Sequence, residues 1–241
     1  MHWALFIIIN MFAGFFQGVV GLGHALIATP LSLIFLPKAT VFTAVFVAGC
    51  ILNPYVARQI KEPLDTRIFW PLLGGAVLGM PIGTVILHLI PKNALLIVVG
   101  SMSIVLTPVI LFGKLKFHNH LKMAAPVTGF ISGVLQTSTS MAGPPVALLL
   151  SGTDISKHAM RKLLVTYFFA VSAIAIPFLF IGHLFTLQGM LFGLSVAPFI
   201  IVAGHYGNKV SHYIPPAWYR VMALVTISIT GLLAILTGLK S

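Results

Sequence analysis

The sequence predicts an all-α integral membrane protein made of two inverted repeats, each a glycine-rich broken or hairpin element followed by three transmembrane helices. Three observations predict this class. Hydrophobic residues make up 59% of the 241 residues and charged residues only 7%, which is more apolar surface than a water-soluble domain can bury. Apolar runs of membrane-spanning length recur along the chain, and a polar, glycine-rich tract occurs twice.

Apolar runs of about 20 residues match a hydrocarbon core about 30 Å thick. Two of the runs, at residues 3–37 and 123–153, are longer than one span and are interrupted. The other six, each expected to form one transmembrane helix, occupy residues 40–57, 68–90, 93–113, 160–182, 186–208 and 217–238. Trp3, Trp70 and Trp218 lie near the starts of runs, as interfacial anchors should. We therefore expect one multi-pass domain in the cytoplasmic membrane over residues 1–241.

The interrupted runs contain two related tracts, at residues 14–30 and 129–145. At an offset of 115 residues, glycines align with glycines and the closing proline of one tract aligns with that of the other. The duplication predicts internal repeats over residues 1–116 and 117–241.

The basic residues predict how the interrupted runs cross the membrane. If each run crosses once, the fourteen Lys and Arg residues divide equally between the two sides. If both runs are hairpins, only Lys38, Lys92 and Lys240 lie on the side of the termini, and all the others lie opposite. The positive-inside rule favours the hairpins, with both termini outside. Each half then has an odd number of traversals, which makes the repeats inverted, as in many secondary transporters. The charges leave open whether the hairpin arms cross fully or meet at mid-membrane.

A polar tract at membrane depth must face protein or a watery cavity. We expect the two tracts and a polar residue of the following helix to line such a cavity and to bind a small anion through amide, hydroxyl and imidazole groups and helix N-termini. The candidate residues are Gln17, Gly18, Gly21, Gly23, His24, Ala25, Asn53, Gln136, Thr137, Ser138, Thr139, Ser140 and Met141. For each of them a structural alternative stays open, since glycines pack membrane helices and hydroxyls bond their own helix.

Several kinds of site are not expected. The three acidic residues, Glu62, Asp65 and Asp154, fall in loops, so no carboxylate is available for a cation site or a proton relay within a span. If transport is coupled to protons, the best-placed carriers are His24 and His205. The single cysteine and the absence of clustered ligands predict no metal site, no cofactor and no catalytic role. Because the bases lie in loops between apolar runs, we read them as topology signals and expect no nucleic-acid partner.

The tracts resemble those of the sulfite exporter TauE/SafE family, also called the 4-toluene sulfonate uptake permease family. Gly18, Gly21 and Gly23 fit the first glycine-rich tract of that family, although His24 and Ala25 stand where it usually has glycines. The stretches at residues 79–83 and 142–145 fit its third-helix pattern and, in part, its second tract.

The resemblance implies a secondary transporter that carries sulfite, a sulfonate or a sulfoacetate-like organosulfonate across the cytoplasmic membrane. Our hypothesis is alternating access around a midplane site between the two tracts; the alternative is a passive channel for anions or small solutes. The expected partners are a small anionic substrate and the lipid bilayer. The glycines at positions 75, 79 and 83 would either support a homodimer or pack inside the chain.

Overall fold

The computed structural model describes residues 2–112, 121–153, 155–211, 213 and 216–240, and this part of the chain is helical with short connections. The boundary expected between residues 116 and 117 lies outside the described residues, as do Lys114 and Lys116. The helices are α1 (His2–Val20), α2 (His24–Phe35), α3 (Lys38–Gln59), α4 (Thr66–Leu89), α5 (Lys92–Phe112), α6 (Leu121–Thr139), α7 (Gly143–Ser151), α8 (Lys157–Ile181), α9 (Leu187–Ser195), α10 (Ala197–Ser211) and α11 (Pro216–Lys240).

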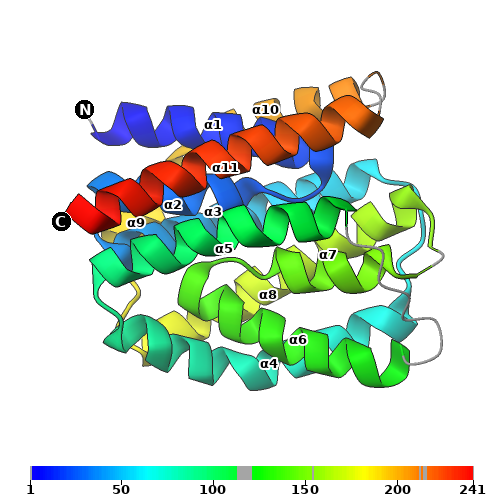
Figure 1. The fold of residues 1–241 in the computed structure, drawn as a ribbon, viewed down its shortest axis with the longest axis horizontal. Coiled ribbons are helices and arrows are strands. Elements are labelled where there is room, and N and C mark those ends of the chain that lie inside the picture. The colour runs from blue at the N-terminus through cyan, green and yellow to red at the C-terminus, as the bar shows by residue number, and fades with distance from the viewer. Residues whose placement is uncertain (1, 113–120, 154, 212, 214–215, 241) are drawn as a thin grey trace.

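The long helices run side by side, and the start of α1 and the finish of α11 lie at the same end of the bundle (Figure 1). We call this the terminal end and the other the opposite end. At the terminal end, Lys38 Nζ at the start of α3 donates to the carbonyls of Leu87, His88 and Ile90 at 2.8, 3.1 and 2.8 Å. At the opposite end, Lys162 Nζ donates to the carbonyls of Ala57 and Ile60, where α3 finishes. Each lysine thereby supplies a donor to carbonyls at a helix terminus, where intrahelical N–H donors run out.

Both interrupted runs are broken in their polar tracts, at residues 21–23 and 140–142, and the chain reverses at each break (Figure 1). Gly21 and Gly23 have φ angles of 82° and 123°, and Ser140 has a φ of 63°. Glycine adopts this left-handed region without strain, whereas serine does not. The arms are unequal: α1 is long enough to span the membrane, but α2 and α7 have only 12 and 9 residues. The short arms therefore begin part-way through the bundle.

The two broken elements match at an offset of 119 residues in the sequence. α1 and α6 both have 19 residues and begin 119 positions apart, as do the two breaks, at Gly21 and Ser140. The offset of 115 residues that aligns glycine with glycine and proline with proline differs from this by about one helical turn. Identical residues in the two tracts are therefore not equivalent in the folded chain.

Glycines bring pairs of helices into close contact. In the α1–α10 pair, Gly18 lies against Gly204, and Gly207 lies against the Phe15 carbonyl. In the α4–α6 pair, the face formed by the glycines at positions 75, 79 and 83 lies against the backbone of α6. Of the two uses expected for this face, the chain shows internal packing, so the face is not open to a second copy.

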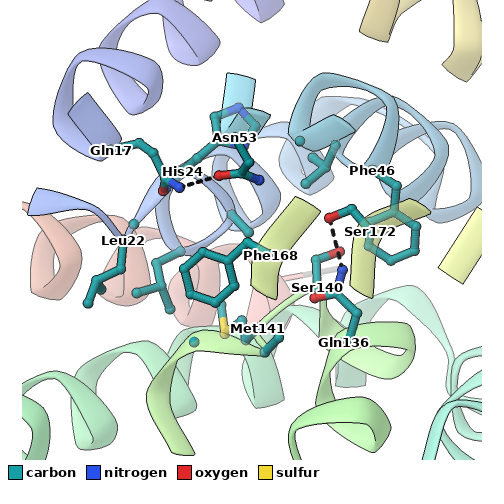
Figure 2. A pocket seen from close by; sticks show the side chains of 17 residues that line it. Gln17, Leu22, His24, Phe46, Asn53, Gln136, Ser140, Met141, Phe168 and Ser172 are labelled. Carbon is teal, nitrogen blue, oxygen red and sulfur yellow. Dashed lines mark hydrogen bonds between the residues drawn. The ribbon is translucent and has the colours of Figure 1, made fainter. Parts of the chain in front are cut away.

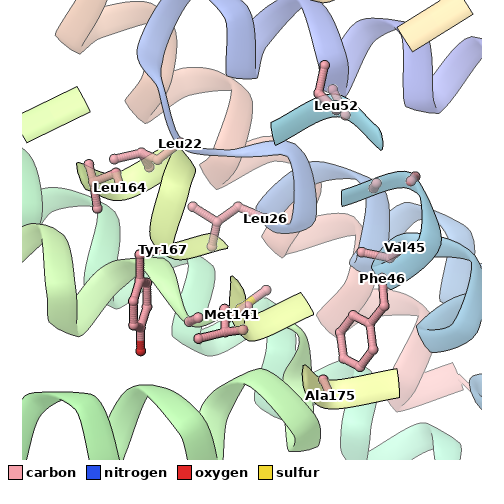
Figure 3. Packing of buried hydrophobic residues seen from close by; sticks show 14 of the residues in the cluster. Leu22, Leu26, Val45, Phe46, Leu52, Met141, Leu164, Tyr167 and Ala175 are labelled. Atoms are coloured by element: carbon pink, nitrogen blue, oxygen red, sulfur yellow. The ribbon is translucent and has the colours of Figure 1, made fainter. Parts of the chain in front are cut away.

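Buried apolar side chains fill the space between these pairs. Figure 3 shows Leu26 of α2, Val45, Phe46 and Leu52 of α3, Met141 of the second break, and Leu164, Tyr167 and Ala175 of α8 close together. The helices α3 and α8, which pack on each other, therefore form the centre of the bundle.

The single helix expected at residues 186–208 is wrong, because α9 and α10 meet at Val196 with a bend of 44°. Pro198 has no N–H to donate to the carbonyl four residues earlier, and its ring crowds that carbonyl. Gly189 and Gly193 meanwhile let α9 lie directly on the backbone of α3.

Four helices of the described chain are long and apolar enough to cross a membrane, at Trp3–Val20, Lys38–Gln59, Thr66–Leu89 and His158–Ile181, and the bent pair α9–α10 makes a fifth if it is one span. Large apolar side chains such as Leu78, Val85 and Leu89 project outward from α4, as expected for a helix that faces lipid.

Replacing Gly75 with leucine should destabilise the fold, because a Cβ at this position would overlap the Pro126 carbonyl oxygen. Overpacking of this kind costs about 1–3 kcal/mol, which should appear as a lower midpoint of thermal unfolding in detergent. The matched control is Gly74→Leu on the same helix, where a Cβ would meet nothing within 4 Å. Equal shifts for the two variants would contradict the close α4–α6 contact.

Candidate substrate site

A small cavity lies where the two breaks face each other across α3 and α8 (Figure 2). Gly49 and Asn53 line it from α3, and Phe168 and Ser172 line it from α8. All four lie well inside helices that run the length of the bundle. The cavity is therefore near mid-depth, at the level where the short arms α2 and α7 begin.

The first break supplies a directed chain of hydrogen bonds. The backbone N–H of His24 donates to Gln17 Oε1 at 2.9 Å, so the amide nitrogen of Gln17 must point the other way. That nitrogen donates to Asn53 Oδ1 at 2.7 Å. The Asn53 amide nitrogen is consequently the donor at the end of the chain, beside the cavity.

The second break repeats the glutamine bond of this arrangement, with Ser172 in place of the longer Asn53. Gln136 Nε2 donates to Ser172 Oγ at 3.4 Å, and the two residues are 36 positions apart, as are Gln17 and Asn53. Ser140 also lines the cavity, and its hydroxyl oxygen is buried with no hydrogen-bond partner among the described residues. A buried hydroxyl without a partner is unfavourable unless something else binds it. Ser140 is thus the clearest group for a ligand to contact.

Buried hydrogen bonds from α6 and α8 hold the backbone of the second break in place. Ser132 Oγ donates to the Ala142 carbonyl at 2.7 Å, and the Tyr167 hydroxyl donates to Ser132 Oγ at 2.8 Å. Ser132 and Tyr167 are both fully buried. These bonds fix the backbone on which Ser140 and Met141 stand.

The first break is held by Arg161 of α8. Its guanidinium donates to the Gly18 carbonyl and, at 3.4 Å, to Ser211 Oγ at the finish of α10. A Cβ at Gly21 would press on the arginine stem, so glycine is needed there for contact as well as for its φ angle. Arg161 lies between the cavity and the opposite end of the bundle.

Among the described residues that line the cavity there is no Asp, Glu, Lys or Arg, and Phe46 and Phe168 give it aromatic walls. The N-termini of α2 and α7, neither of which has a side-chain cap, supply positive potential to the cavity. Pro144 and Pro145 carry no N–H, so α7 offers fewer backbone donors than α2. The two helix ends are therefore unequal as anion binders.

The structure brings many of the predicted site residues together. Those that line the cavity are Gln17, Gly23, His24, Ala25, Asn53, Gln136, Ser140 and Met141.

The other predicted residues lie outside the cavity lining. Gly18 packs on α10, and Gly21 contacts Arg161. The hydroxyl of Thr137 donates to the Met80 carbonyl, and those of Ser138 and Thr139 donate to carbonyls of their own helix. For these three, the structural alternative describes what the side chains do.

His205 lies away from the cavity, on an exposed face of α10, where its Nδ1 is 3.2 Å from the Tyr55 hydroxyl.

Sequence reasoning missed Ser172, Phe46, Phe168 and Asn10, whose Oδ1 lies 3.0 Å from His24 Nε2. The offset of 119 would have found Ser172, because it relates Asn53 to Ser172 as it relates Gln17 to Gln136. No comparable signal marks Phe46 or Phe168, which lie in apolar spans where other large apolar residues are frequent.

Fold and cavity together define a polytopic helical membrane protein with a buried polar pocket between two broken helices. The family model described as Sulfite exporter TauE/SafE matches residues 6–234. The chain belongs to this family, which confirms the resemblance of its tracts, and membership implies a membrane transporter of sulfur-containing anions. No curated protein and no solved structure matches the chain.

Replacing Gln17 with methionine should destabilise the first break, because the backbone N–H of His24 loses its acceptor and the side-chain oxygen Oδ1 of Asn53 loses its donor. Leaving buried polar groups unpaired costs about 1–3 kcal/mol each. The measurement is the unfolding midpoint in detergent, with Gln188→Met on the exposed face of α9 as the control. An unchanged midpoint for the Gln17 variant would contradict the hydrogen-bond chain.

Proposed function

We propose that the protein is a secondary transporter that binds a sulfur-containing oxyanion in the central cavity and exposes it alternately to the two ends of the bundle. The observation that carries this proposal is the buried hydroxyl of Ser140, which has no hydrogen-bond partner among the described residues and lies in a mid-depth cavity of a chain of this family. A carrier needs such a site near the membrane midplane, reachable from either side in turn.

The groups around the cavity suit a small monoanion. Ser140, Ser172 and the Asn53 amide can donate to the oxygens of sulfite, a sulfonate or a sulfoacetate-like compound. With no cationic side chain in the lining, a dianion would be poorly compensated in a low-dielectric site. Hydrogen sulfite or a sulfonate, each singly charged, therefore fits better than the sulfite dianion.

Alternating access follows naturally from inverted repeats, and several features support such repeats here. The α1–α10 and α4–α6 pairs each join the long hairpin arm of one half to a helix of the other half. The paired helices run in the same direction in both cases, as the glycine contacts indicate. The breaks carry left-handed residues at equivalent positions, Gly21 and Ser140.

Hydrogen bonds that join helix ends would act as the gates of such a carrier. Arg161 joins α8 to α1 and α10 at the opposite end, and Lys38 joins α3 to α4 at the terminal end. Each set of bonds would have to separate for its end to open. Because the donors are charged, the separation is easier where water can enter.

The opposite end is proposed to be cytoplasmic. In the hairpin reading of the sequence, every Lys and Arg other than Lys38, Lys92 and Lys240 falls on that side, and the positive-inside rule places that side in the cytoplasm. A reporter fused after Lys240 should therefore be active only outside the cell, as alkaline phosphatase activity would measure. A reporter such as a fluorescent protein inserted after Glu62 should be cytoplasmic. The reverse pattern would overturn the orientation.

Replacing Ser140 with alanine should weaken anion binding and uptake about tenfold, because a hydrogen bond to a charged ligand contributes about 1.5 kcal/mol. The measurement is uptake of labelled sulfite and sulfonates into proteoliposomes, together with ligand-induced thermal shift. Ser138→Ala is the matched control, since that hydroxyl bonds only the Val134 carbonyl of its own helix.

Saturable uptake that falls in the Ser140 variant and not in the control supports the carrier. Flux that never saturates would point instead to a passive channel, and equal uptake by both variants would contradict the site.

A further inference from the structure

The feature that carries a further inference is the contact between Asn10 of α1 and His24 of α2. Asn10 is fully buried, and its Nδ2 donates to the Phe6 carbonyl at 2.8 Å. A carbonyl can only accept, so the amide nitrogen must face Phe6 and Oδ1 must face the other way. Oδ1 lies 3.0 Å from His24 Nε2.

This geometry fixes the tautomer of His24. An amide oxygen only accepts, so Nε2 must carry a hydrogen. A neutral imidazole has one N–H, and its Nδ1 is then a bare lone pair. Because the backbone N–H of His24 is bound by Gln17 Oε1, the base of the side chain is also held in place. Nδ1 is left as the polar atom of His24 that no described residue bonds.

His24 lines the same cavity as Ser140 and Ser172. A sulfonate or sulfite oxygen that approaches a lone pair is repelled, whereas an N–H at the same atom would donate to it. We propose that His24 takes a proton on Nδ1 when the anion binds, so that one proton accompanies each anion, and that Asn10 is the positioning residue that enforces this coupling. The proposal rests on the transport function proposed above.

Charge compensation supports the same conclusion. An anion alone in a cavity without cationic side chains is costly to bury, whereas an anion beside an imidazolium forms a pair of zero net charge. Helices α1, α3, α5 and α11 pack against α2. Their titratable side chains with described surroundings are Lys38, Cys50, Tyr55 and Arg58 on α3, Lys92 on α5 and Lys240 on α11. These residues do not line the cavity, and neither does Arg161, which bonds the Gly18 carbonyl of α1.

The proton step is balanced without any other reactant. A proton from the water at the open end adds to Nδ1 as the anion enters, and it leaves from Nδ1 to the water at the other end as the anion departs. The imidazole is regenerated in its Nε2–H tautomer by the bond to Asn10.

The test is calorimetric titration of the purified full chain with methanesulfonate, which stays a monoanion between about pH 5 and 9 and so contributes no proton of its own. Titrations in two buffers of different ionisation enthalpy count the protons taken up. In the pH range where His24 is neutral in the free wild-type protein, we expect one proton to be taken up with each anion. In that range the affinity should fall tenfold for each unit by which the pH rises.

Two variants separate coupling from mere support of the fold. In Asn10→Leu the neutral ring is free to move its hydrogen to Nδ1, so the anion should bind with little proton uptake and a flat pH profile. In His24→Asn the amide can donate without titrating, and the same flat profile is expected. His205→Asn is the control and should keep the wild-type proton count.

Binding by the wild type with no proton uptake, or a proton count lost in His205→Asn and kept in His24→Asn, would overturn the inference while leaving the transport function intact. The transport function itself fails if neither methanesulfonate nor sulfite binds or is taken up. The wild-type proton count decides the question even if a variant does not fold.

Discussion

The constraint on which the structure depends is that lipid cannot satisfy the backbone polar groups of a broken helix. The two breaks, at residues 21–23 and 140–142, must therefore be enclosed by protein, and the chain does this by setting them against α3 and α8 at the centre of the bundle. Gln17, Ser132 and Arg161 then bond the groups that the breaks expose. The cavity is what remains between two breaks that have been stabilised in this way, with Ser140 as its least satisfied group.

Much of this could be predicted from sequence, because composition and charge respond to the bilayer directly. The all-helical class, the two broken elements and the family followed from apolar runs, glycine-rich tracts and matching motifs. Position within a helix was harder to predict. Matching glycines suggested an offset of 115, but glycines serve packing at several levels of a helix, and the folded elements correspond at 119. The bend before Pro198 was missed because only Val196 separates α9 from α10, so the apolar run continues through the break almost without interruption.

The residues of the candidate site also differ in how well the sequence could predict them. The amides proposed for the site, those of Gln17, Asn53 and Gln136, line the cavity because their side chains are long enough to reach across helices. The sequence could not tell cavity hydroxyls from structural ones. Ser138 and Ser140 are only two positions apart, but Ser138 bonds a carbonyl of its own helix, whereas Ser140 lines the cavity. Only the left-handed backbone at Ser140 separates them, and no local pattern announces it. The role of Asn10 could not be predicted, because it depends on a contact with His24, which is fourteen residues away in the sequence.

The basic side chains at the helix ends have two roles that cannot be changed independently. Lys38 and Lys162 belong to the charge pattern from which the orientation of the chain was inferred, and each also binds carbonyls at the end of a neighbouring helix. An experiment that moves positive charge from one face to the other, in order to reverse insertion, would therefore also loosen the packing of the helix ends. The way the chain is threaded into the bilayer and the strength with which its ends are tied together are thus linked through the same few amines.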